Sequence, residues 1–153
     1  MSTSPSTQPP RPTHVVTCIL LRHDVQPAQM LLMHRSQKVG SYHAHWAGVS
    51  GFVEPNVTPE EQAFTEIREE TGWQRDQVRM RRRGVVVEYV DNEIARHFYI
   101  HPFLFDALSP ESIRIDWEAT EMRWVDPAEL KNYTTVPRLQ EVYDAAMHGE
   151  VMS

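Results

Sequence analysis

Three glutamates near the middle of the chain have a spacing that could create a cation site. Glu66, Glu69 and Glu70 follow one another at intervals of three and four residues, which on a helix place their carboxylates on one face. Like charges at such spacings repel, at a cost of about 0.2–0.5 kcal/mol per i,i+4 pair. Hard divalent cations such as Mg²⁺ prefer oxygen ligands and commonly bring phosphates with them. The spacing therefore predicts a divalent-metal site that serves phosphate chemistry.

Local signals define the helix that would carry these glutamates. Thr58 is a good N-cap residue, Pro59 suits the first helical position, and Glu61 completes the pattern of a capping box. An apolar stripe at helical spacing follows, and Gly72 is a natural stop. We therefore expect a helix over residues 59–71.

A short strand over residues 49–53 and a turn are expected just before this helix. Gly51 lies in that strand, where the absence of a side chain allows a ligand to approach the backbone closely. The stretch from 51 to 73, GFVEPNVTPEEQAFTEIREETGW, resembles the Nudix box, with its leading glycine, its paired glutamates and its closing glycine. The positions that match in register are Gly51, Glu66, Ile67, Glu69, Glu70, Gly72 and Trp73.

Two positions depart from the family pattern. Val57 stands where the family has its first glutamate, and Thr65 stands where it has an arginine. The resemblance implies that the family's glutamate and arginine at these two positions normally brace the loop against the helix. Their joint replacement removes a supporting pair and leaves the clustered glutamates intact.

The resemblance implies a fold, a reaction and a set of roles. The fold class would be α/β (α+β), with a mixed β-sheet sandwiched between α-helices. The reaction would be cleavage of the diphosphate linkage in a nucleoside diphosphate joined to another moiety, with Mg²⁺ or Mn²⁺ as cofactor. The implied metal ligands are Glu66, Glu69, Glu70 and the backbone carbonyl of Gly51.

The general base stays open, because Nudix enzymes take it from different places. Glu69 within the motif is one candidate. Glu118 and Glu121, in an acidic segment ahead of a predicted strand, are the others. That segment resembles the late acidic loop of the family, and a solvated acidic loop explains it equally well.

Three residues are candidates for substrate binding. Arg35 could contact phosphates, although a surface role is favoured for it. Trp46 could stack on a base, although packing under the sheet is favoured. Tyr89 follows the motif at a distance that resembles dinucleoside polyphosphate hydrolases, whereas the proline that tends to mark ADP-ribose pyrophosphatases is absent. An aromatic residue of a strand explains Tyr89 as well.

Composition favours one domain in a reducing compartment. The chain has 153 residues, 41% of them hydrophobic, and a net charge of −6, so bulk attraction to nucleic acid or membrane is not indicated. Residues 1–12 read as a disordered tail and 13–149 as a single domain. With a single cysteine, Cys18, and no apolar leader, we expect a cytoplasmic location. The expected partner is a small nucleotide-type molecule, and a homodimer is left open.

The remaining segments alternate between strand patterns and short helical patterns. Strands are expected at residues 14–22, 30–34, 79–90, 94–106 and 123–125, with a hairpin turn at 91–93. Helices are expected after Asp126 and over residues 136–147.

Two classes of function follow from the sequence. The favoured one is a metal-dependent pyrophosphohydrolase, because a chain without activity has no electrostatic reason to keep mutually repelling acids. The alternative is a catalytically impaired Nudix-like module that binds nucleotides or regulates, because Val57 and Thr65 depart from the pattern.

Overall fold

The computed structural model describes residues 9–116 and 118–152. Within this part of the chain the strands form one mixed sheet, flanked by helices. The strands are β1 (Arg11–Arg22), β2 (Gln29–Arg35), β3 (Trp46–Ala47), β4 (Val49–Phe52), β5 (Val78–Arg83), β6 (Val87–Asp91), β7 (Arg96–Ala107), β8 (Ala119–Val125) and β9 (Glu150–Val151). The α-helices are α1 (Pro59–Thr71) and α2 (Leu139–Met147), and the 3₁₀ helices are η1 (Arg75–Gln77), η2 (Pro110–Ser112) and η3 (Pro127–Asn132).

The long strand β1 organises the sheet. It pairs in parallel with β7 along one edge, and antiparallel with β4 and then β2 along the other. Beyond β7 lie β5 and β6, and beyond β2 lie β8 and β3. Because β4 leads directly into α1, its pairing with β1 fixes the start of that helix relative to the middle of the sheet.

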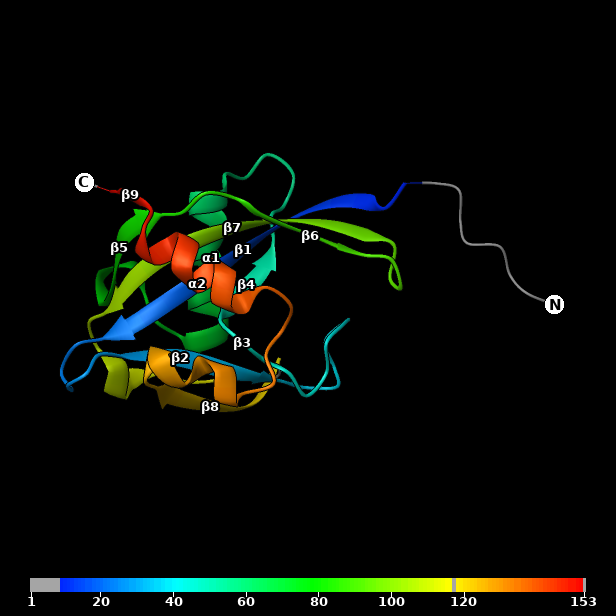
Figure 1. The fold of residues 1–153 in the computed structure, drawn as a ribbon. Helices are drawn as coiled ribbons and strands as arrows, with labels where there is room; N and C mark the ends of the chain where they lie inside the picture. Colours follow the sequence, from blue (N-terminus) through cyan, green and yellow to red (C-terminus); the bar gives the residue numbers. More distant parts are fainter. Residues whose placement is uncertain (1–8, 117, 153) are drawn as a thin grey trace.

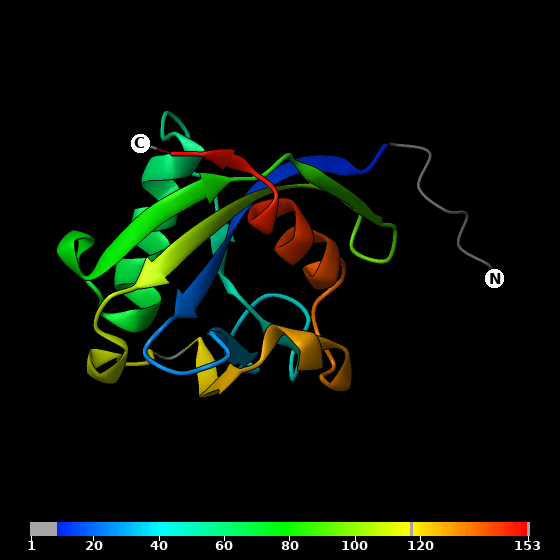
Figure 2. The ribbon, with the colours of Figure 1, turned by 60° about the vertical axis from the view of Figure 1, so that its left-hand side comes forward.

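The two α-helices cover opposite faces of this sheet, as Figures 1 and 2 show. On β1, Val16, Cys18 and Leu20 belong to the core that packs against α1. The alternating residues Ile19 and Leu21 belong to the core beneath α2. Burial on both faces explains why this strand is a continuous apolar run rather than an alternating one. The predicted fold, a mixed sheet sandwiched between helices, is confirmed.

Helix α1 has the bounds that its local signals predict. The Thr58 hydroxyl accepts a hydrogen bond from the Glu61 amide at 3.2 Å. At the other end Gly72 adopts the left-handed conformation, with φ of 78°, which favours glycine. Both ends depend on residues within the helix or next to it, so they can be recognised without the tertiary structure.

The prediction of one strand over residues 79–90 was wrong, because β5 and β6 are separate. They pair with different halves of β7, on either side of Pro102. Pro102 has no N–H to offer a partner strand, and its carbonyl accepts instead from Gly84 in the connection. A Cβ atom at Gly84 would lie 2.5 Å from the Ala145 carbonyl oxygen in α2, so the chain crosses beneath that helix where no side chain fits.

Several element boundaries also differ from the predictions. Strand β8 begins at Ala119, so Glu121 lies in a strand and not in an acidic loop. Helix α2 begins at Leu139, because Arg138 has a positive φ of 69° and Pro137 disfavours a helical residue before it. Strand β1 begins at Arg11, inside the range expected to be a tail; residues 1–8 of that range lie outside the described part.

No helix in residues 9–116 and 118–152 is long and apolar enough to cross a membrane.

Candidate functional site

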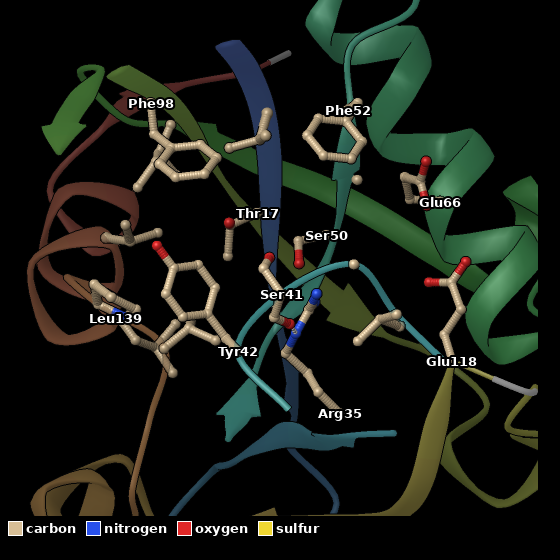
Figure 3. Close-up of a pocket in the computed structure, with 18 of the residues that line it drawn as sticks. Thr17, Arg35, Ser41, Tyr42, Ser50, Phe52, Glu66, Phe98, Glu118 and Leu139 are labelled. Carbon is tan, nitrogen blue, oxygen red and sulfur yellow. Dashed lines mark hydrogen bonds between the residues drawn. The ribbon is translucent and has the colours of Figure 1, made fainter. Parts of the chain in front are cut away.

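A cavity of about 320 Å³ brings most of the predicted site residues together. Figure 3 shows it with α1 on one side, α2 on the other and strands β1 and β4 between them. One end is acidic and receives residues from α1, and the other end is apolar and receives residues from α2. The predicted residues that line it are Arg35, Gly51, Glu66, Glu69, Tyr89 and Glu118.

Glu66 lies against the backbone of Gly51 and is almost closed off from solvent. Its side chain is 8% exposed, and a Cβ atom on residue 51 would overlap its carboxyl group. Burial raises the pKa of Glu66 to about 7, against the effect of its hydrogen bonds to Glu70 and Gln62. Near neutral pH this carboxyl is therefore poised between its protonated and ionised forms.

Glu70 lies one helical turn further along α1 and deeper in the protein. Its pKa is raised well above the usual value, first by burial and then by the negative charge of Glu66, to which it is hydrogen-bonded. Its Oε2 atom is buried and has no hydrogen-bond partner in the described residues. An orphaned buried carboxylate oxygen is costly, and a bound cation would satisfy it.

Glu69 and Glu118 complete the acidic end. Glu69 is exposed at the cavity, on the same helix as Glu66. Glu118 reaches the cavity from the segment before β8, where burial and the charge of Asp116 raise its pKa. Glu66, Glu69 and Glu118 thus line the acidic end of the cavity, and Glu70 is buried next to Glu66.

Arg35 is a positively charged residue of the cavity wall that interacts electrostatically with these acids. Its pKa is lowered by burial, while the charges of Glu70 and Glu118 oppose that effect. Its Nε atom donates to the Ser41 carbonyl oxygen at 3.0 Å, which fixes the guanidinium at the cavity wall. An arginine held in this way can bind an anionic oxygen that enters the cavity.

The donor set fits a hard divalent cation. Glu66, Glu69 and Glu70 could supply carboxylate oxygens, and Gly51 brings a backbone within contact of the Glu66 carboxyl. In the described residues no three side chains of His, Cys, Asp or Glu converge as a ready-made ligand set. Because Glu66 and Glu70 are hydrogen-bonded to each other, they would have to turn from one another toward a cation.

The opposite end of the cavity is built from aromatic and aliphatic side chains. Tyr42, Tyr89, Phe98 and Leu139 line it together with valines and Ile100. The Tyr42 hydroxyl donates to Asp91 Oδ2 at 2.7 Å, which ties the loop after β2 to the β6–β7 hairpin. A flat apolar group such as a nucleobase could stack here.

Three predicted site residues do not line the cavity: Glu70, which is buried beside Glu66, and Trp46 and Glu121. Trp46 is 9% exposed and packs in the core beneath α2, where its ring contacts those of His34 and Tyr133. Glu121 has a half-exposed side chain on β8 and forms an ion pair with Arg123 at 3.7 Å. Neither residue lines the cavity.

Some cavity residues could not be found from the sequence motif. Tyr42, Phe98 and Leu139 come from a loop, a strand and a helix that meet only in the fold. Gln62 does not line the cavity, but its contact with Glu66 could be inferred from the sequence. It precedes Glu66 by four residues, or about one helical turn, and side chains at this spacing lie next to each other. Its amide does donate to Glu66 Oε1, at 2.9 Å.

Comparisons with known proteins identify the family. Residues 11–146 match the NUDIX domain, so the chain belongs to the Nudix family. No curated protein sequence matches it at a significant level.

Solved structures agree on the fold. A C. elegans Ap4A hydrolase in a binary complex superposes with a TM-score of 0.74 at 14% identity, covering 87% of this chain and 93% of that one. The Nudix hydrolase RenU from M. smegmatis gives a TM-score of 0.68 at 19% identity, covering 95% of this chain and 91% of that one. The NUDIX domain of Shewanella oneidensis NrtR, complexed with ADP ribose, gives a TM-score of 0.67 at 14% identity, covering 88% of this chain and 85% of that one.

Proposed function

We propose that the protein is a metal-dependent pyrophosphohydrolase that cleaves the diphosphate linkage of a nucleoside diphosphate joined to another moiety. The observation that carries this proposal is the buried Oε2 atom of Glu70, which has no hydrogen-bond partner among the described residues. Glu70 lies beside Glu66, which lines the acidic end of the cavity. A bound cation would offset the free-energy cost of burying that oxygen without a partner. A diphosphate substrate would need the same cation to neutralise its negative charge.

Glu66, Glu69, Glu70 and the Gly51 carbonyl would hold Mg²⁺ or Mn²⁺. The metal, when bound, neutralises phosphate oxygens and lowers the pKa of a bound water. Arg35 holds a further phosphate oxygen and so fixes the diphosphate between the acidic and apolar ends. In this arrangement the glutamates of α1 bind the cation, and the reacting water lies toward the opposite wall of the cavity.

We assign the role of general base to Glu118. Glu121 does not line the cavity, whereas Glu69 and Glu118 do. Glu118 comes from a different part of the chain than the α1 carboxylates, so it can accept the proton of the attacking water while they hold the cation. Glu118→Gln should lower kcat without weakening Mn²⁺ binding, whereas Glu69→Gln should weaken it.

The substrate is a nucleotide-type molecule, with its base at the apolar end beside Tyr89 and Phe98. Two structural relatives suggest probes: one is named as an Ap4A hydrolase, and another was solved with ADP ribose. We place the reaction in the cytoplasm, where the buried thiol of Cys18 stays reduced.

A substrate panel tests the proposal. Purified protein is incubated with ADP-ribose, Ap4A and other nucleoside diphosphate derivatives in Mg²⁺ or Mn²⁺, and both products are identified. We expect turnover of some member of the panel and loss of turnover in EDTA. Turnover that persists in EDTA would contradict the metal-dependent reaction.

A binding module is the alternative, and one observation favours it. The family's loop-to-helix brace is absent, because the side chain of Val57 has no polar atom and the Thr65 hydroxyl donates to the Glu61 carbonyl within its own helix at 3.1 Å. Absence of turnover across the panel, together with nucleotide binding that needs no metal, would support this reading.

A further inference from the structure

The side chain of Gln62 connects the loop before α1 to Glu66. Its Oε1 atom accepts from the backbone amide of Glu54 at 3.1 Å, and its Nε2 atom donates to Glu66 Oε1 at 2.9 Å. The side chain is 2% exposed. Each end of the amide meets a partner of the opposite hydrogen-bonding type, so only one orientation of the group satisfies both.

We propose that Gln62 is a positioning residue, which replaces the missing loop-to-helix brace and holds the Glu66 carboxylate in place for the cation. This inference rests on the proposed function, because it gives Glu66 a metal to bind. Gln62 itself touches neither substrate nor cation. It acts through Glu66: its hydrogen bond to one carboxyl oxygen of Glu66 orients that carboxyl as a metal ligand.

The position of the bridge supports this role. Glu54 lies in the segment that joins β4 to α1, the same segment that contains Val57. Thr65, the other altered position, is committed to a hydrogen bond within α1. The two departures from the family pattern therefore leave the loop without a polar connection through those residues, and Gln62 supplies one from the buried face of the same helix.

The bridge also fixes the direction of the Glu66 carboxyl. The Gln62 amide is held at its other end by the Glu54 backbone, so the Glu66 oxygen that accepts from it has a fixed position. Without that donor, the Glu66 carboxyl can rotate away from the Gly51 backbone that it contacts. Loss of the bridge should therefore weaken cation binding.

The variant Gln62→Met tests the proposal, because it keeps an unbranched side chain of similar length and removes both hydrogen bonds. Mn²⁺ binding without substrate is measured from the EPR signal of the free ion. We expect the Kd for Mn²⁺ to rise by about 10–100-fold, the range for partners that orient metal ligands. At saturating Mn²⁺, kcat should fall while KM for the nucleotide changes little.

A matched control is present on α2. Gln140 donates through Nε2 to Asp144 Oδ1 at 3.2 Å, at the same i,i+4 spacing but on an exposed surface. Gln140→Met should leave Mn²⁺ affinity and kcat unchanged. Thermal unfolding in EDTA checks that both variants are folded at the temperature of the binding measurement. If Gln62→Met does not fold, Gln62→Asn takes its place, because it keeps an amide that is one methylene too short to reach both partners.

The outcomes separate this inference from the proposed function. A wild-type protein that binds Mn²⁺ and turns over substrate, beside a folded Gln62 variant with unchanged Mn²⁺ affinity and kcat, would overturn the role of Gln62 alone. Absence of Mn²⁺ binding by the wild type would overturn both, because Glu66 would then have no cation to hold.

Discussion

The carboxyl group of Glu66 occupies the space that a side chain on Gly51 would need. Gly51 belongs to β4 and Glu66 to α1, so this contact sets how closely the helix approaches the strand that precedes it. Both residues line the same cavity. The glycine is needed here for space and not for an unusual backbone conformation.

Gly51→Ala should therefore displace Glu66. We expect the Kd for Mn²⁺ to rise at least tenfold and the free energy of unfolding to fall by about 1–3 kcal/mol, the usual cost of overpacking. Isothermal titration calorimetry and chemical denaturation measure the two effects. Gly40→Ala is the steric control, because a Cβ atom there meets nothing within 4 Å. Equal Mn²⁺ affinity in the two variants would contradict the steric account.

Glu70→Gln should separate metal binding from stability. The substitution keeps the shape and removes a charge whose burial is unfavourable, so the metal-free protein should melt at the same temperature or higher. Turnover should fall by about 100-fold or more, since a ligand is lost. Glu93→Gln, on the exposed β6–β7 turn, changes the net charge equally and should have no effect. Unchanged turnover in Glu70→Gln would rule out its role as a ligand.

The stability of the metal-free protein should fall as the pH rises from about 4.5 to 7. The pKa of Glu66 is raised by burial to about 7 in the fold, from its ordinary value of 4.5. Between these values the unfolded chain binds fewer protons than the native state, so the free energy of unfolding decreases with pH.

Thermal melting in EDTA across this pH range checks the effect. Added Mg²⁺ should stabilise the protein more at pH 7.5 than at pH 5, because it replaces the proton. If the melting temperature in EDTA rises from pH 5 to 7, the burial of Glu66 does not dominate the dependence of stability on pH.

The sequence predicts those features that depend on neighbouring residues. The bounds of α1 follow from Thr58 and Gly72, and the motif places Gly51 and Glu66 in one register. The cavity could not be predicted, because it depends on contacts such as that of Tyr42 with Asp91, which are far apart in the chain. The break between β5 and β6 was missed because its cause, Pro102, lies on the partner strand.

The position of Trp46 shows a second limit of prediction from the sequence. An aromatic residue two positions before Gly48 is compatible with stacking on a base or with core packing, and no local signal separates the two. The fold places it among His34 and Tyr133, away from the cavity. Gln62 shows the converse, since its spacing from Glu66 is visible in the sequence but its bond to Glu54 is not.

The double variant Val57→Glu with Thr65→Arg should restore the brace that the family pattern implies. We expect the pair to stabilise the protein, or raise its rate, by more than the sum of the two single changes. A coupling energy of about 0.5–3 kcal/mol is typical of residues in contact. Denaturation of the four proteins of the cycle measures it. Strict additivity would show that the two positions do not interact.

Tyr89 should contribute its ring and not its hydroxyl. Tyr89→Phe should leave KM nearly unchanged, whereas Tyr89→Leu should raise KM about three- to tenfold, as expected for loss of about 0.5–1.5 kcal/mol of aromatic stacking. Steady-state kinetics on the best substrate of the panel checks this. An equal KM for the Phe and Leu variants would place the base elsewhere.

The most direct measurement of the central claim is hydrolysis in H₂¹⁸O, with mass spectrometry of both products. We expect wild-type protein with Mg²⁺ or Mn²⁺ to cleave a nucleoside diphosphate derivative at its diphosphate, with one ¹⁸O atom in one phosphate-bearing product. Reaction should cease in EDTA and in Glu70→Gln. Absence of labelled product from every substrate, or label incorporation that is equal in EDTA, would contradict metal-dependent diphosphate hydrolysis.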